Sequence, residues 1–226
     1  MNYIKKEKEM KNIYFIDFET TGLNPYHDEV IELGIRKIND TNFYTSLVVP
    51  EKENGIHYKY VSKEITNLNG ITDSMIIKHG INSQEATFNM YKYILDTCED
   101  GPIYIVAHNG FSFDFIFFRR LIQNYNASDK LRTRTSSINL DIIKRFKYID
   151  TLHVARYLLP NDRVNQRALC GIFNVKNESE HRAMGDVNAL IQLYMIMCEQ
   201  LSYINKKGDK TFYITNTETL MNELLI

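Results

Sequence analysis

Two acidic residues end an apolar stretch at residues 13–19 (Ile-Tyr-Phe-Ile-Asp-Phe-Glu), where they could bind a cation. Asp17 and Glu19 are two positions apart, so in a strand both side chains point to the same face. Burying carboxylates among apolar residues costs free energy unless a cationic group pairs with them. A divalent metal ion and a buried Arg or Lys both meet this requirement, and the pair alone leaves the choice open.

Two more acids stand at positions that could contribute to the same chemistry. Asp114 lies among aromatic residues near the start of an expected helix, where interaction with the helix dipole is the simpler interpretation. Asp186 lies within the last expected helix, five residues after His181. Five residues place two side chains about 140° apart around a helix. We therefore expect His181 in the preceding loop or a frayed first turn, where a lone histidine is more often an ordinary surface residue.

The elements that must position these residues follow from the apolar pattern. Apolar runs predict strands over residues 13–19, 30–38, 43–49, 103–107 and 148–150. A hairpin turn at 39–42 should join the second and third of these strands. Helical spacing predicts helices over residues 83–98, 111–125, 151–158, 166–173 and about 180–201. This order predicts an α/β fold with a mixed five-stranded sheet flanked by helices. No dinucleotide-binding or P-loop glycine pattern is present.

Composition narrows the class of protein. With 226 residues, 44% hydrophobic and 24% charged, the chain reads as a folded globular protein. Its net charge of −1 argues against a histone-like polycation but allows a local basic patch. The stretch 130–147 is such a candidate: it either tracks phosphates or is simply solvated.

The cysteines and the lengths of the apolar runs indicate the cellular compartment in which the protein is expected. The three scattered cysteines support neither a disulfide framework nor a zinc site, which indicates a reducing compartment. No signal peptide or membrane span is recognised. We expect a soluble protein in the cytoplasm, with the nucleus also open, divided into a charged extension (1–11), a main domain (12–202) and an appendage (203–226).

Taken together, the three sequence segments that carry these acids resemble the motifs of the DEDDh exonucleases, the DnaQ-like 3′-to-5′ exonucleases with an RNase H-like fold. Asp17-Phe18-Glu19-Thr20-Thr21-Gly22 matches the first motif of that family, and residues 109–114 and 181–186 match the second and third. Weaker matches lie at 29–34, 70–72 and 150–151. Within the family, residues 107–115 and 185–187 look more like the three-prime repair (TREX-type) exonucleases, although the polyproline insert of that group is absent.

This resemblance implies a metal-dependent enzyme that removes nucleoside 5′-monophosphates from the 3′ end of DNA. By resemblance, Asp17, Glu19, Asp114 and Asp186 hold two Mg²⁺ or Mn²⁺ ions. Asp17 would bridge both ions, Glu19 and Asp186 would complete the water-activating site, and Asp114 would act through waters. His181 matches the general base that takes a proton from the attacking water.

The resemblance also implies how the end of the nucleic acid is held. The terminal sugar would meet the backbone near Thr20 and Thr21, Leu23 would wedge beside the last base, and Asn109 and Phe113 would line the pocket. Core packing is the alternative for both Leu23 and Phe113. Rival functions are an exoribonuclease of the RNase T or oligoribonuclease kind and an interaction subunit that binds a polymerase or repair partner through residues 211–226. Relatives of the three-prime repair type also make a homodimer an open expectation.

Overall fold

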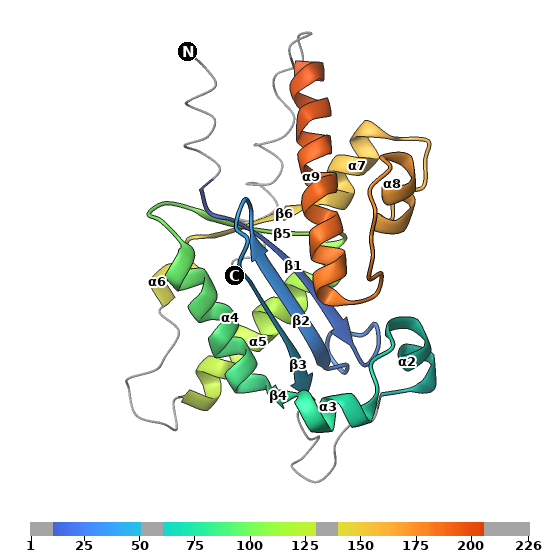
Figure 1. Cartoon of the computed structure of the whole chain (residues 1–226). Helices are drawn as coiled ribbons and strands as arrows, with labels where there is room; N and C mark the ends of the chain where they lie inside the picture. The colour runs from blue at the N-terminus through green and yellow to red at the C-terminus, as the bar shows by residue number, and fades with distance from the viewer. Residues whose placement is uncertain (1–10, 51–60, 130–139, 206–226) are drawn as a thin grey trace.

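A computed structural model describes residues 11–50, 61–129 and 140–205 of the chain (Figure 1). Its centre is a six-stranded sheet in the order β4-β3-β2-β1-β5-β6. The strands, in chain order, are β1 (Ile13–Thr20), β2 (Val30–Lys37), β3 (Phe43–Val49), β4 (Ile81–Asn82), β5 (Ile103–Ala107) and β6 (Phe146–Asp150).

The strand directions decide which segments meet. The first three strands form an antiparallel meander, whereas β5 pairs parallel with β1 and β6 pairs parallel with β5. The carboxyl ends of β1, β5 and β6 therefore lie at the same edge of the sheet. Side chains at the end of β1, after β5 and at the end of β6 are brought together there, although they are far apart in the sequence.

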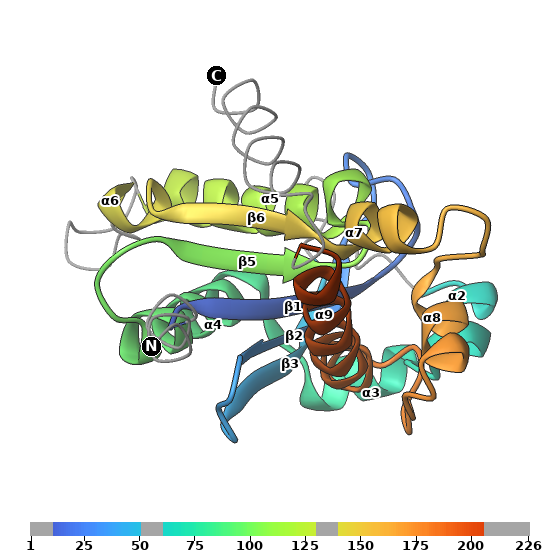
Figure 2. The same cartoon turned by 90° about the horizontal axis from the view of Figure 1, so that it is seen from above.

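Helices cover both faces of the sheet (Figures 1 and 2). On one face lie α4 (Ser83–Thr97) and α5 (Asp114–Asp129), and on the other lies α9 (Ala183–Asn205), which packs on β1 and β2 and is flanked by α7 (Thr151–Leu158) and α8 (Gln166–Ile172). The shorter helical segments are α2 (Lys63–Asn69), α3 (Asp73–His79), α6 (Leu140–Ile143) and the 3₁₀ turn η1 (Gly110–Ser112).

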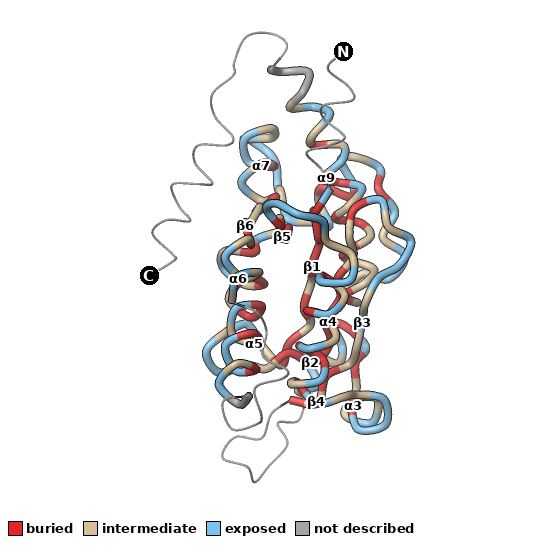
Figure 3. The backbone as a smooth tube through the Cα atoms, turned by 90° about the vertical axis from the view of Figure 1, so that its left-hand side faces the viewer, coloured by how far each residue is buried: buried red, intermediate tan, exposed pale blue. Residues whose placement is uncertain are grey.

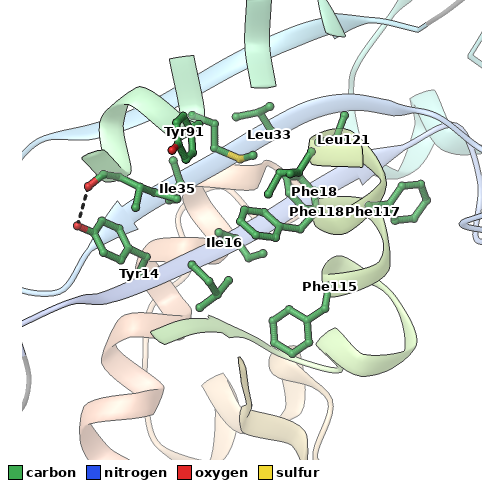
Figure 4. Packing of buried hydrophobic residues seen from close by; sticks show 14 of the residues in the cluster. Tyr14, Ile16, Phe18, Leu33, Ile35, Tyr91, Phe115, Phe117, Phe118 and Leu121 are labelled. Atoms are coloured by element: carbon green, nitrogen blue, oxygen red, sulfur yellow. Dashed lines mark hydrogen bonds between the residues drawn. The ribbon is translucent and has the colours of Figure 1, made fainter. Parts of the chain in front are cut away.

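Strand β1 is buried on both faces along most of its length (Figure 3). Tyr14, Ile16 and Phe18 pack with α4 and α5 in the largest hydrophobic cluster (Figure 4). The alternate residues, Ile13 and Phe15, pack against α9 in a separate cluster. Because side chains alternate along a strand, the next two positions on the α9 face are Asp17 and Glu19.

The structure confirms the α/β class and the mixed sheet, and it corrects the number of strands. The sheet has six strands because the two residues of β4 add to the edge of β3, a contact too short to leave a pattern in the sequence. The helix expected at 111 begins at Asp114 after the turn η1, and the last helix begins at Ala183 rather than near residue 180.

Some predictions concern residues outside the described ranges. The first ten residues of the predicted extension, residues 130–139 of the basic stretch and nearly all of the predicted appendage belong to this group. Among the helices that are described, none is both long and apolar enough to cross a membrane.

Candidate active site

Three of the predicted acids meet at the carboxyl end of β1. Asp17, Glu19 and Asp186 each offer a carboxylate oxygen, and these oxygens all lie within 4.8 Å of one another. The geometry follows from the fold: α9 begins beside the end of β1 and runs back over its apolar half, so Asp186 in the first turn of α9 meets the two acids of the strand. The three carboxylates are called the acidic group below.

Asp114 approaches β1 from the side of β5. The pairing of β1 with β5 ends at Phe15 and Val106, so the backbone of β1 beyond this point needs another partner on that side. Asp114, at the first residue of α5, supplies it: its Oδ1 accepts a hydrogen bond from Phe18 N at 3.2 Å. The side chain is buried, only 4% exposed, and lies outside the 4.8 Å group.

His181 lies in the loop before α9, as the helical spacing predicts. Its φ of 62° is in the left-handed region, where non-glycine residues are uncommon and often functional. Its backbone N–H donates to Asp186 Oδ2 at 2.9 Å, which ties this turn directly to the acidic group. The imidazole is about 41% exposed, and its Nε2 lies 3.8 Å from Glu180 Oε1.

Close packing fixes where α9 begins. A Cβ atom on Gly185 would lie 2.1 Å from the carbonyl oxygen of Ser179, so only glycine allows the loop to pass this close to the helix. A Cβ on Gly34, in β2, would lie 3.0 Å from the backbone of Ala183. These two close approaches bring the His181 turn and Asp186 onto the sheet.

The acids at this site resist ionisation. Burial raises the pKa of Asp17 well above its usual range, and the neighbouring charges of Asp114 and Asp186 raise it further. Burial also raises the pKa of Asp114 to about 8. The pKa values of Glu19 and Asp186 are raised as well, chiefly by burial. Fully ionised, the four acids need positive charge from another source.

The described residues do not supply that charge. No Lys or Arg among them forms an ion pair with a member of the acidic group, and none of them donates a hydrogen bond to the Asp17 carboxylate. The nearby Arg182 is engaged instead with Glu32, at 2.5 Å. Oxygen-only donors of this kind fit Mg²⁺ or Mn²⁺ better than zinc. The alternative of a buried Arg or Lys partner for Asp17 and Glu19 is therefore not observed in the described ranges.

Side-chain amides contact the acidic group from three other segments, and the sequence analysis missed all of them. Asn69 Nδ2 donates to Glu19 Oε2 at 2.9 Å, and Asn177 Nδ2 donates to Asp186 Oδ1 at 2.8 Å. Gln166 Nε2 donates to the same Asp186 Oδ1 at 3.1 Å. Asn69 precedes a glycine at the end of a short helix, which is ordinarily a turn signal, and Gln166 and Asn177 belong to no motif that indicates a role in a site.

The loop after β1 is held by its own polar contacts. Thr21 Oγ1 donates to Asp28 Oδ1 at 3.1 Å, and Thr20 Oγ1 donates to the carbonyl oxygen of Gly22. Arg120, in α5, donates to the carbonyl oxygens of Pro25 and Asp28. In contrast to these anchored residues, Leu23 is 82% exposed, which removes core packing as the explanation for this leucine.

The loop after β5 is held by a fifth acid, the buried Asp150 at the end of β6. Its Oδ1 accepts a hydrogen bond from Asn109 N at 2.8 Å, and its Oδ2 accepts one from Phe111 N at 3.1 Å. Asn109 is exposed, with a left-handed φ of 62°. Phe113 is half-buried and packs edge-on against Phe117, so core packing accounts for part of its surface.

Known proteins match most of the chain. A model of the RNase_T family, described as an exonuclease family, matches residues 14–194. A PolC-type DNA polymerase III from Thermotoga petrophila is 28% identical over 203 residues, which is 88% of this chain and 13% of that protein. The PolC-type enzyme from Lacticaseibacillus paracasei is 32% identical over 176 residues, 76% of this chain and 10% of that protein. The chain thus spans about a tenth to an eighth of these relatives.

Solved structures share the fold. Escherichia coli exonuclease I in complex with a dT13 oligonucleotide has a TM-score of 0.61 and 16% identity, covering 88% of this chain and 44% of that one. Exonuclease X in complex with 5′ overhanging duplex DNA has a TM-score of 0.54 and 20% identity, covering 83% of this chain and 92% of that one. At these identities the likeness concerns the fold alone.

Proposed function

The chain belongs to the RNase_T exonuclease family, the DEDDh or DnaQ-like 3′-to-5′ exonucleases, and from this premise we propose that it hydrolyses DNA from the 3′ end and releases nucleoside 5′-monophosphates. The observation that carries the proposal is the acidic group at the end of β1 with the His181 turn hydrogen-bonded to it. An inactive interaction subunit would not need to keep these three carboxylates and the His181 turn together.

The side chains have distinct roles in this proposal. Asp17, Glu19 and Asp186 would hold the divalent cations, and Asp114 would contribute its charge from the side of α5. Two Mg²⁺ or Mn²⁺ ions, when bound, supply an activated water and stabilisation of the leaving 3′ oxygen. His181 accepts the proton of the attacking water at an imidazole nitrogen. Its partial exposure lets that proton pass on to solvent.

The end of the substrate would be held by the two anchored loops. Thr20 and Thr21 would present backbone to the terminal sugar, and the exposed Leu23 would pack beside the last base. Asn109 and Phe113, on the loop that Asp150 fixes, would line the other side of the pocket. A pocket closed around one terminal nucleotide explains a preference for free ends over internal bonds.

We propose DNA rather than RNA as the substrate because of what is known of the similar proteins. Exonucleases I and X were solved with DNA, and the similar chains are parts of DNA polymerases. Similarity to PolC-type enzymes supports action on the 3′ end that a polymerase has made, with the polymerase as partner. The closer assignment to three-prime repair exonucleases and the homodimer stay predictions.

Digestion of labelled oligonucleotides tests the proposal. Single-stranded DNA carrying a 5′ label should give a ladder that shortens from the 3′ end in Mg²⁺, and the same strand in EDTA should stay intact. A 3′-terminal phosphorothioate linkage should slow the first step, and RNA of the same sequence should be cut more slowly. Internal cleavage, faster cleavage of RNA, or no cleavage of any strand would each contradict the function proposed here.

A further inference from the structure

The buried acids around the site are matched by two different kinds of partner. Glu32, only 5% exposed, accepts hydrogen bonds from the Arg182 guanidinium at 2.5 to 3.2 Å and from Ala183 N at 3.0 Å. This carboxylate is neutralised within the chain. Glu19 and Asp186 lie close by, yet the side chains that contact them are amides.

Asn69 can present only its N–H group to Glu19. The side chain is buried, 5% exposed, at the last residue of α2, and its Oδ1 accepts the backbone N–H of Ile71 at 3.0 Å. Because the oxygen is used in this way, Nδ2 must face Glu19 Oε2, 2.9 Å away. The end of α2 therefore fixes one oxygen of a carboxylate that comes from β1.

The same arrangement recurs around Asp186. Asn177 uses its Oδ1 to accept the backbone N–H of Ser179, so its Nδ2 faces Asp186 Oδ1 at 2.8 Å. Gln166 Nε2 lies 3.1 Å from Asp186 Oδ1 and 3.0 Å from the backbone carbonyl oxygen of Asp186. Because both of these oxygens are acceptors, the Gln166 atom that faces them must be the amide nitrogen, which donates to both. Two segments outside α9 thus fix the rotamer of this acid.

We propose that Asn69, Gln166 and Asn177 are positioning residues that hold Glu19 and Asp186 in place for divalent cations without neutralising them. An amide donates a hydrogen bond and carries no net charge, whereas Lys or Arg at the same place would neutralise the carboxylate, as Arg182 neutralises Glu32. The inference rests on the proposed function only in assuming that the acidic group binds metal. Partners that orient metal-binding side chains typically change metal affinity or activity by about 10–100-fold when removed.

The test is the affinity for Mn²⁺, measured by calorimetry on the whole chain without nucleic acid. Gln166→Met keeps the size of the side chain and removes the donor, and Gln166→Lys puts a cation in its place. Gln192→Met is the matched control, since Gln192 is exposed on α9 and, among the described residues, donates to the carbonyl oxygen of Asn188 alone. Asn69→Ala is paired with Asn82→Ala, which removes another amide that accepts a backbone N–H and donates to a glutamate, here Glu85, away from the site.

We expect Gln166→Met and Asn69→Ala to weaken Mn²⁺ binding by about 10-fold or more. Gln166→Lys should weaken it further, while the two controls bind as the unmodified chain does. The melting temperature without metal is measured for every variant: Asn82→Ala loses the N-cap hydrogen bond of α4 and should melt lower, so its unchanged Mn²⁺ affinity would show that lost stability alone does not weaken binding. Unchanged Mn²⁺ affinity in Gln166→Met and Gln166→Lys would overturn the inference. Unmodified protein that binds Mn²⁺ but cuts no DNA would instead refute the proposed function and leave this inference standing.

Discussion

His181 shows how one residue can be placed for chemistry by its backbone. A left-handed φ costs free energy for a residue with a side chain, of the order of 1 kcal/mol or more. Here that conformation turns the backbone N–H onto Asp186 and leaves the imidazole partly exposed beside the acidic group. The left-handed turn therefore fits a group that must receive a proton and release it.

Replacing His181 by Ala should separate metal binding from catalysis. The four acids remain, so the affinity for Mn²⁺ should stay within a few-fold of the unmodified chain, while the rate of DNA hydrolysis should fall by about 10²-fold or more. His79→Ala, an exposed change on α3, is the control and should leave both unchanged. Normal turnover by His181→Ala would remove this residue from the mechanism.

Asp17 and Glu19 were conspicuous in the sequence because they are carboxylates in an apolar strand, whereas Asp114, Asp186 and His181 were assigned to the site through the family resemblance. Glu32 carries the same signal, as a single acid inside an apolar strand, but its partner in the structure is an arginine, Arg182. The amides were not found because Asn and Gln are common at helix ends and turns. Their roles depend on contacts between segments 9 to 50 residues apart.

At the scale of elements, the site depends on the register of β1 and on where α9 begins. Alternation along β1 puts Asp17 and Glu19 on one face, and the packing of α9 on Ile13 and Phe15 shows that this is the α9 face. The start of α9 is less visible in the sequence, because it is set by contacts of Gly185 and Gly34 with other segments. Helices α2 and α3, of seven residues each, were not predicted from the sequence, although α8, of the same length, was.

Gly185→Ala should disturb the His181 turn. The added Cβ would meet the backbone of Ser179 at 2.1 Å, so the loop or the helix must move. We expect a loss of about 1–3 kcal/mol in the free energy of unfolding, measured by urea denaturation, together with slower hydrolysis. Gly171→Ala is the control: beyond its own helix backbone and chain neighbours, nothing described lies within 4 Å of the new Cβ in α8, so stability should hold or rise by up to about 1 kcal/mol. Equal stability and activity in both variants would show that the close approach at Gly185 is unimportant.

At the scale of the whole molecule, parallel strand ends gather the chemistry at one edge of the sheet. The end of β1, the loop after β5 and the end of β6 meet there, and α9 covers the group from one face. The net charge of −1 suits this arrangement, because the acids of the site offset basic residues elsewhere. Two bound divalent ions would change the total to about −1 + 4 = +3, so near-neutrality is compatible with a nucleic-acid substrate.

The central claim is that the acidic group is the site of hydrolysis, and removing the Asp17 carboxylate tests it most directly. Within the described ranges, the acidic group is the one cluster of three or more side chains that could bind a metal ion. The measurement is the rate of Mg²⁺-dependent cleavage of single-stranded DNA by Asp17→Asn beside the unmodified chain. Cleavage should be lost by more than the ~10–100-fold expected for an outer partner, while the metal-free melting temperature holds or rises because the variant removes a buried carboxyl group crowded by other acids. Cleavage by Asp17→Asn at the unmodified rate would mean that hydrolysis takes place elsewhere and would contradict the central claim.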